Sequence, residues 1–108
     1  SYVDEILPYE TMISGAIFNL GYLPGGDKTI VTYPETTIAA IKGCLNHLCH
    51  NGVIVVVAYY GHPGGEREKN TVLEFGSQLD QKRYSVLKYS FLKQQHFPPI
   101  LMAIQRID

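Results

Sequence analysis

The chain has 108 residues, of which 45% are hydrophobic and 18% are charged, and its formal net charge at pH 7 is -1. These values are typical of one globular domain with a real core, and they exclude a disordered chain or a membrane-spanning helix of roughly 18 apolar residues. A net charge near zero gives no general attraction to nucleic acid, although a local basic patch can bind it at any total charge.

The first predicted strand covers residues 14–20 and is apolar on both faces, as in a parallel sheet that is covered on each side. A loop with three glycines, residues 19–28, begins at the end of this strand. Helix-start signals follow in Thr32, Pro34 and Glu35. An apolar stripe at helical spacing then predicts a helix of about four turns, with Gly52 as its left-handed cap; the stripe consists of Ile38, Ile41, Leu45 and Leu48.

Residues 53–59 form a continuous β-branched run, which predicts a central parallel strand and hence a βαβ unit. A second glycine-rich loop, residues 60–65, follows this strand. A helix is predicted over residues 66–79, with Val72, Phe75 and Leu79 on one face. Residues 84–92 and 99–106 read as strands joined by a link too short for a helical crossover, so the chain is expected to end in an antiparallel hairpin.

The predicted fold is therefore an α/β sheet with parallel strands and a terminal hairpin, and both glycine-rich loops follow its parallel strands. Ligands of open α/β sheets bind beyond the carboxyl ends of these strands. We therefore expect the two loops to form one shared site. The chain starts at Ser1 with residues that resemble the middle of a domain, so we also expect it to be a piece of a longer protein.

Asn19 and Tyr22 are the candidate catalytic residues of the first loop. The Asn19 amide oxygen and the Leu20 carbonyl could both accept hydrogen bonds from one substrate amine, which would hold its lone pair toward an electrophile. Tyr22 could stack on a planar group. An equally open interpretation is that Asn19 caps a turn, Tyr22 covers the core and the glycines only shape the loop.

In the second loop, His62 could accept a proton from a substrate ammonium, and Tyr60 could stack on a base. The alternative is a solvated turn histidine beside a core-edge tyrosine. Two other patterns favour simpler interpretations. A cluster of cysteine and histidine side chains does not converge as a closed metal site requires, and a basic group near the hairpin is better explained as a solvated face; these are Cys44, His47, Cys49 and His50, and Lys82, Arg83, Lys88 and Lys93.

Several motifs together resemble the rRNA methylase family of small bacterial S-adenosylmethionine-dependent methyltransferases. The resemblance runs from about Ala16 onward and rests on four stretches, which are residues 19–28, Gly61-His62-Pro63, residues 72–75, and Gln94-Gln95 with Pro98-Pro99. It implies a Rossmann-like class I methyltransferase sheet, whose last strand inserts antiparallel. It also implies an enzyme that methylates the aminomethyl nitrogen of wobble 2-thiouridine in tRNA, with rRNA as the less favoured substrate. Because no signal-peptide pattern opens the chain and Cys44 and Cys49 are not expected to form a disulfide, the cytoplasm is the expected compartment.

The resemblance further implies which residues of the chain serve the reaction. S-adenosylmethionine would contact Asn19, Leu20 and Gly21, and the RNA would contact residues of both loops, which are Leu20, Tyr22, Pro24, Gly25, Gly26, Lys28, Tyr60 and His62. The family's first cofactor loop and its acidic partner have no counterpart in residues 1–108. The chain is therefore expected to be the C-terminal part of a methyltransferase domain. Residues 19–22 occupy the place of the Asn/Asp-Pro-Pro-Tyr motif of amino methyltransferases. In this chain, Leu20 and Gly21 stand where that motif has its two prolines.

Two other functions remain open from the sequence. The chain could act only as a binding or dimerisation module, because its first strand would expose an apolar edge able to pair with a second copy. It could also be half of a nicotinamide-dependent oxidoreductase, which the Asn-Leu-Gly-Tyr motif and the hairpin disfavour.

Overall fold

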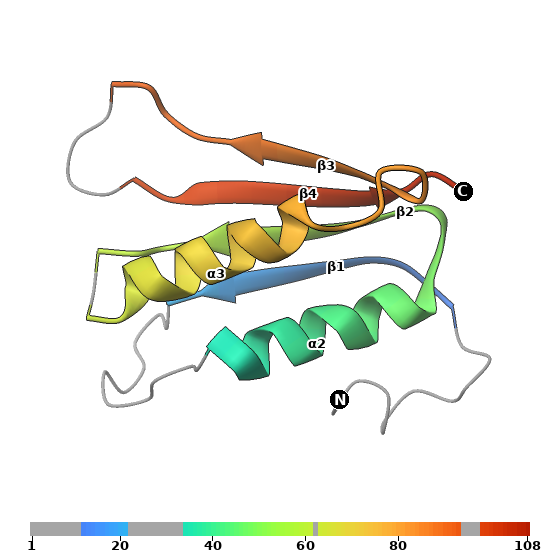
Figure 1. The fold of residues 1–108 in the computed structure, drawn as a ribbon, viewed down its shortest axis with the longest axis horizontal. Helices are drawn as coiled ribbons and strands as arrows, with labels where there is room; N and C mark the ends of the chain where they lie inside the picture. The colour runs from blue at the N-terminus through green and yellow to red at the C-terminus, as the bar shows by residue number, and fades with distance from the viewer. Residues whose placement is uncertain (1–11, 22–33, 62, 94–97) are drawn as a thin grey trace.

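The computed structural model describes residues 12–21, 34–61, 63–93 and 98–108. These form four strands and two helices (Figure 1). In chain order they are β1 (Ile13–Leu20), α2 (Pro34–His47), β2 (Leu48–Ala58), α3 (Gly65–Ser77), β3 (Tyr84–Tyr89) and β4 (Ile100–Arg106). The predicted order of strands and helices is therefore confirmed.

The strands form one sheet in the order β1-β2-β4-β3. β1 pairs in parallel with β2, which confirms the βαβ unit. β4 pairs antiparallel with both β2 and β3, so β3 runs parallel to β2 and the last strand lies between them. This is the inserted antiparallel strand that the resemblance implies, and it confirms the predicted α/β fold class.

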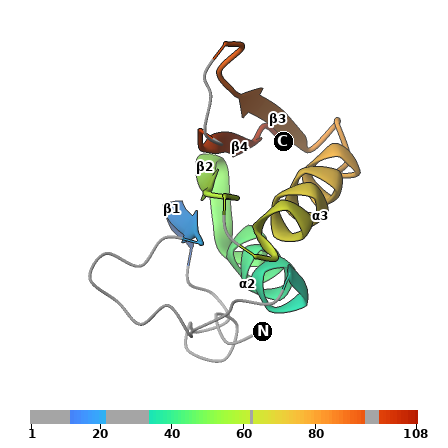
Figure 2. The ribbon, with the colours of Figure 1, turned by 90° about the vertical axis from the view of Figure 1, so that its left-hand side faces the viewer.

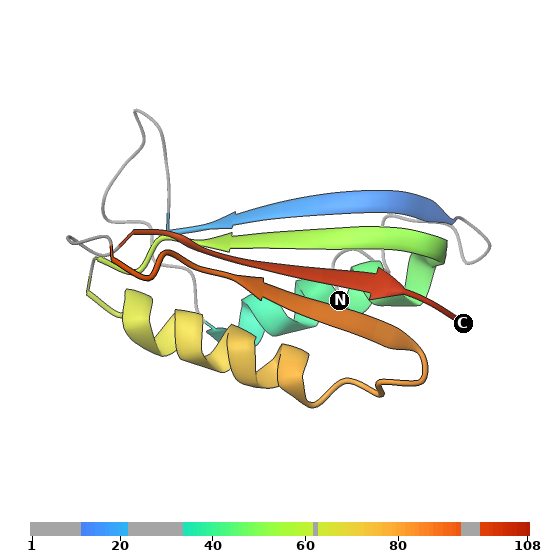
Figure 3. The ribbon, with the colours of Figure 1, turned by 90° about the horizontal axis from the view of Figure 1, so that it is seen from above.

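Both helices lie on the same face of the sheet (Figures 2 and 3). Alternate strand residues point toward them and are buried, because a strand presents successive side chains to opposite faces. Val56 pairs with Met102, and Ile54 pairs with Ile104, so each pair lies side by side beneath the helices. With Ile41 and Leu48, these residues are at most 2% exposed and form the centre of the core.

The opposite face of the sheet carries apolar side chains that no helix covers within the described residues (Figure 2). One row crosses the sheet from edge to edge and consists of Ile17, Val55, Ala103 and Leu87. Its two outer members are 71% exposed at Ile17 and 58% exposed at Leu87. The predicted exposed apolar edge at β1 is therefore present in the described sheet.

The boundary between α2 and β2 differs from the prediction. The helix ends at His47 and the strand begins at once with Leu48, where a bulge shifts the pairing with β1. The left-handed residue is Asn51, with φ of 65°, and not Gly52. Gly52 is required for space, because a Cβ there would lie 2.7 Å from Leu48 Cδ1 and 2.9 Å from the Cys49 carbonyl oxygen.

Two further predictions were wrong in detail. β3 ends at Tyr89 and does not reach Leu92, which is 98% exposed. The buried face of α3 consists of Gly65, Glu68, Val72 and Gly76, whereas Phe75 and Leu79 are only partly buried. Gly76 brings the helix close to β4, since a Cβ there would lie 2.4 Å from Met102 Sδ. The apolar pattern alone did not reveal this close approach.

An ion-pair cluster lies at the C-terminal end of β4. Arg106 Nε and Arg83 Nε donate to the Asp108 carboxylate at 2.9 and 3.1 Å, and Arg106 Nη1 donates to the Leu48 carbonyl at 2.5 Å. The hydrogen bond from Arg106, with that from Arg83, holds the pKa of Asp108 below its ordinary value. The bond to Asp108 likewise raises the pKa of Arg83. The cluster ties the end of β4 to the start of β2.

No helix in the described part of the chain is long and apolar enough to cross a membrane.

Candidate functional site

The parallel strands β1 and β2 end side by side at one rim of the sheet, because Leu20 pairs with Ala58 as the last residue of each strand. Beyond the last pair, the Tyr59 N–H donates to the Leu20 carbonyl at 3.0 Å. Both helices begin at this rim (Figure 1). The structure thus brings the first residues of both predicted loops together, where open α/β sheets bind their ligands.

Asn19 lies at this rim with its side chain exposed. It pairs with Val57 across the ladder, and strand alternation directs it to the face away from the helices. Leu20 points the other way and is 7% exposed, which anchors the strand end in the core. Gly21 then takes φ of 77°, a conformation that other residues rarely adopt. The exposed Asn19 side chain is therefore followed directly by a buried anchor, Leu20, and by a left-handed glycine, Gly21.

The Leu20 carbonyl has a partner in the structure, since it accepts the hydrogen bond from Tyr59. A carbonyl oxygen has two lone pairs, so it can accept a second hydrogen bond in addition to the one from Tyr59. The sequence motif did not reveal this bond, because it joins residues on different strands. The bond also fixes the direction of the Leu20 carbonyl. The two prolines of the usual motif would constrain the backbone here, and this chain lacks them.

Tyr60 is partly buried directly after β2, and the Lys69 ammonium lies 4.1 Å from the centre of its ring. An ammonium over a ring face is attracted by the negative potential of the aromatic system. The Tyr60 ring is therefore in contact with Lys69 on α3, and its predicted stacking on a base stays a prediction.

Six predicted site residues lie outside the described residues, namely Tyr22, Pro24, Gly25, Gly26, Lys28 and His62. The roles assigned to them stay predictions. Of the predicted site, the structure therefore describes Asn19, Leu20, Gly21 and Tyr60, and it brings them to one rim.

Two contacts join the helix starts at this rim, and neither was predicted from the sequence. The Thr37 hydroxyl donates to Glu68 Oε2 at 3.4 Å, and these residues are only 3% and 4% exposed. At the surface, Arg67 Nη2 lies 2.9 Å from Glu35 Oε1. Glu68 does precede Val72 and Gly76 by four and eight positions, so helical spacing places a carboxylate on the buried stripe of α3. This spacing was the signal in the sequence that Glu68 could be buried.

The cysteine and histidine side chains are divided between two elements. Cys44 and His47 lie on α2, whereas Cys49 and His50 lie on β2, and no disulfide joins the cysteines. The prediction that Cys49 lies in the helix was wrong. Among residues 12–21, 34–61, 63–93 and 98–108, no three His, Cys, Asp or Glu side chains are arranged to hold a metal ion.

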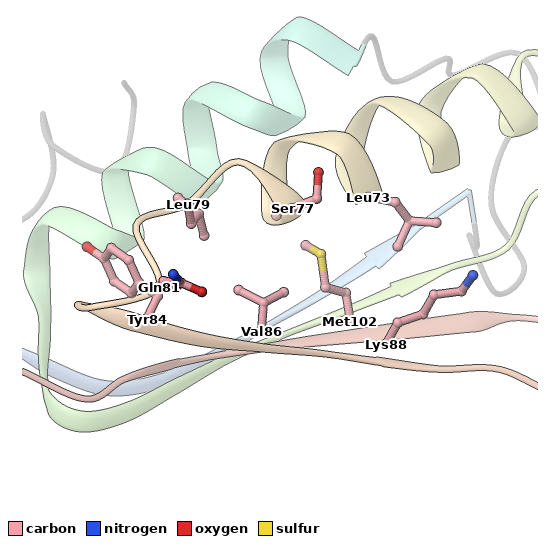
Figure 4. A pocket seen from close by; sticks show the side chains of 9 residues that line it. Leu73, Ser77, Leu79, Gln81, Tyr84, Val86, Lys88 and Met102 are labelled. Carbon is pink, nitrogen blue, oxygen red and sulfur yellow. The ribbon is translucent and has the colours of Figure 1, made fainter.

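A hollow of about 480 Å³ lies elsewhere, between the second half of α3 and β3 (Figure 4). Its walls are mainly apolar, with Leu73, Val86 and Met102 among them, and Lys88 and Gln81 are polar residues of its lining. None of the predicted site residues lines it. Because the predicted site residues that the structure describes lie at the strand rim and not in this hollow, we assign the candidate site to the rim.

Comparisons with known proteins agree with the fold and the motifs. Residues 1–105 match the family described as "Putative rRNA methylase". A curated relative from Arabidopsis thaliana, the chloroplastic tRNA (mnm(5)s(2)U34)-methyltransferase, is 38% identical over 106 residues, which are 98% of this chain and 39% of that protein.

Two solved structures are closely similar. One is described as a "putative rRNA-methylase" from Clostridium thermocellum, with 43% identity and a TM-score of 0.90, and the similarity covers 96% of this chain and 55% of the other. A "putative methyltransferase" from Streptococcus mutans, in complex with SAH, has 38% identity and a TM-score of 0.88, over 98% of this chain and 56% of the other. The chain thus spans between about two fifths and just over half of these relatives.

Proposed function

Because this chain belongs to the rRNA methylase family, we propose that it is the C-terminal part of an S-adenosylmethionine-dependent methyltransferase that acts on an RNA amine. The observation that carries this proposal is the rim at which β1 and β2 end side by side, with Asn19 and Leu20 at the end of one strand and Tyr60 just after the end of the other. The relatives are longer than the matched region, so a longer protein would supply the remaining strands and most of the cofactor contacts.

The described residues fit one edge of a cofactor and amine site. The exposed Asn19 amide carries both a donor and an acceptor, and Gly21 lets the backbone turn away from the strand end without a Cβ. Asn19, Leu20 and Gly21 would contact the cofactor here. S-adenosylmethionine, when bound, supplies an electrophilic methyl group. The similar Streptococcus mutans protein was solved with SAH, which supports this choice of cofactor.

The residues of the chain would act mainly by positioning. The Asn19 amide oxygen and the second lone pair of the Leu20 carbonyl accept hydrogen bonds from the substrate amine, so that its nitrogen lone pair faces the methyl group. The aromatic ring of Tyr60 would stack on a base. Tyr22 and His62 stay our predictions for a wall of the pocket and for the proton acceptor.

We propose the aminomethyl group of wobble 2-thiouridine in tRNA as the substrate. The name of the curated relative, a tRNA (mnm(5)s(2)U34)-methyltransferase, supports this choice. The family description favours rRNA instead, so the substrate has to be tested directly.

The test uses the complete enzyme that we propose contains this chain, with a labelled methyl group on the cofactor. We expect label in tRNA that carries aminomethyl-2-thiouridine, and none in the same tRNA without the aminomethyl group. Ribosomal RNA serves as the competing substrate. Equal labelling of both tRNA samples, or labelling of rRNA alone, would contradict the proposed substrate, and no transfer to any RNA would contradict the proposed activity.

We also keep the binding or dimerisation module as a second candidate function, because Ile17 is 71% exposed on an edge strand of the described sheet. A homodimer formed through β1 would cover this edge.

A further inference from the structure

Three exposed apolar side chains gather where β3 ends. β3 runs parallel to β2, so it ends at the same rim of the sheet as β1 and β2 (Figure 1). Its last residue, Tyr89, is 63% exposed, and Phe91 and Leu92 follow it with 52% and 98% exposed. Exposed apolar side chains that gather at one place often mark an interaction site.

Tyr89 lies in the same row of the sheet as Asn19. Asn19 pairs with Val57, Val57 with Leu101, and Leu101 with Tyr89, so one row crosses all four strands. Residues of one row point to the same face, and Tyr89 is therefore directed, like Asn19, away from the helices. Neighbouring strands lie about 4.8 Å apart, so three steps place the backbone of Tyr89 about 14 Å from that of Asn19. A ligand longer than one nucleotide can contact both.

The hairpin that carries Tyr89 is basic. Residues 81–107 contain five of the nine lysines and arginines of the chain and none of its ten aspartates and glutamates. The two arginines of this segment are paired with Asp108. Lys88 and Lys93 are exposed and form no ion pair with any residue that the structure describes. A chain whose net charge is -1 thus carries a positive segment at its rim, with the exposed rings between two lysines.

This combination fits unpaired nucleotides better than a second copy of the chain. Ammonium groups attract phosphates of any base sequence, and exposed aromatic rings stack on bases that are not paired. A symmetric contact between two copies would instead bring the same positive segment against itself, and like charges oppose such a contact. The sequence alone favoured a solvated face for these lysines, and the structure adds the exposed rings beside them.

We infer that Tyr89 and Phe91, together with Lys88 and Lys93, form an RNA-binding platform beside the amine site. This inference rests on the proposed function. The platform binds unpaired nucleotides next to the one that is methylated, with bases on the two rings and phosphates near the two lysines. It acts on the affinity for the RNA and not on the transfer step, because it lies about 14 Å from the residue that holds the amine.

The first test measures methyl transfer and RNA binding by the complete enzyme, with tRNA that carries aminomethyl-2-thiouridine. Tyr89→Leu keeps an apolar side chain and removes the ring, so we expect KM and Kd for the tRNA to rise about 10-fold, with kcat within about twofold of wild type. Phe91→Leu should act in the same direction. Tyr89→Phe keeps the ring and should keep both wild-type values. Leu87→Ala is the matched control, because Leu87 is 58% exposed in the next row of β3, farther from the rim.

The salt dependence of binding tests the lysines separately. Removing both ammonium groups, as Lys88→Gln with Lys93→Gln, should lower the slope of log Kd against log salt concentration by about 1.4, because each phosphate contact on a single strand contributes about 0.7. Lys82→Gln is the control, since Lys82 is exposed just before the opposite end of β3 and should leave the slope unchanged.

The possible results separate the platform from the proposed function. The inference is overturned where wild type transfers the methyl group and Tyr89→Leu binds the tRNA as tightly as wild type. It is also overturned where these variants change the mass of the enzyme in light scattering but not its affinity for tRNA, because the surface then joins copies of the chain. Tyr89-dependent tRNA binding without any methyl transfer contradicts the proposed function alone, and a wild type that binds no RNA overturns both.

Discussion

Asn51 and Gly52 make adjacent but different demands on the backbone between α2 and β2. Asn51 has the left-handed φ of 65°, which asparagine tolerates better than most residues. Gly52 has no positive φ, but a Cβ would lie 2.9 Å from the Cys49 carbonyl oxygen. The asparagine at position 51 thus meets a conformational constraint, and the absence of a side chain at position 52 meets a steric one.

This difference predicts distinct effects of alanine on the free energy of unfolding of the 108-residue chain. Asn51→Ala should lose about 1 kcal/mol through backbone strain, and Asn51→Gly should restore it. Gly52→Ala should lose about 1–3 kcal/mol through overpacking against Leu48 and the backbone. Denaturant unfolding of the three variants measures these changes. A Gly52→Ala variant as stable as wild type would contradict the steric account.

The sequence could reveal some of these residues and not others. Asn19 stood out because a polar side chain at the end of an apolar strand is informative by itself. Glu68 did not, because a glutamate in the first turn of a helix is ordinarily solvated and favourable there. Only the packing of α3 against α2 makes it a buried residue. Contacts between distant segments, such as Tyr59 with Leu20, likewise depend on the register of the sheet.

Among the helices and strands, β1 is the one most able to contact another chain. It forms one edge of the described sheet, and Ile17 begins the apolar row that crosses the uncovered face. An unpaired edge with an exposed apolar residue is a template for pairing with another strand.

We therefore predict that the isolated chain associates at high concentration and that Ile17→Lys reduces this association. The replacement removes the exposed apolar side chain from the edge strand, and Ile17 is 71% exposed, so its replacement should leave the fold intact. Ser14→Lys is the matched control, because it adds the same charge to the same strand at another exposed position. Light scattering measures the mass. A monomeric wild type, or equal association in both variants, would contradict the prediction.

The elements themselves were largely predictable. The β-branched run of β2 and the short link before β4 are strong local signals, and they led to the correct βαβ unit and terminal hairpin. The place of β4 between β2 and β3 was implied only by the family resemblance. The boundaries were less accurate where tertiary contacts decide them. Leu48 continues the helical stripe in the sequence, but pairing with Ile13 makes it the first residue of β2. Residues 90–92 continue an apolar pattern beyond the last partner that β4 offers to β3.

At the scale of the whole molecule, the described residues form part of a site and part of a fold. The described helices cover a single face of the sheet, and the described site residues occupy a single rim. The relatives extend well beyond the matched region, which agrees with our proposal that a longer enzyme completes both. In that enzyme the Asn19 amide would hold the substrate amine while other segments hold most of the cofactor.

The most direct test of this account is methyl transfer by the Asn19→Ala variant of the complete enzyme, measured with tRNA carrying aminomethyl-2-thiouridine. We predict that turnover falls about 100-fold, because the amine loses an acceptor that positions it, while the exposed Asn46→Ala control on α2 keeps wild-type turnover. Near wild-type turnover of a folded Asn19→Ala variant would contradict the central claim that this asparagine positions the amine.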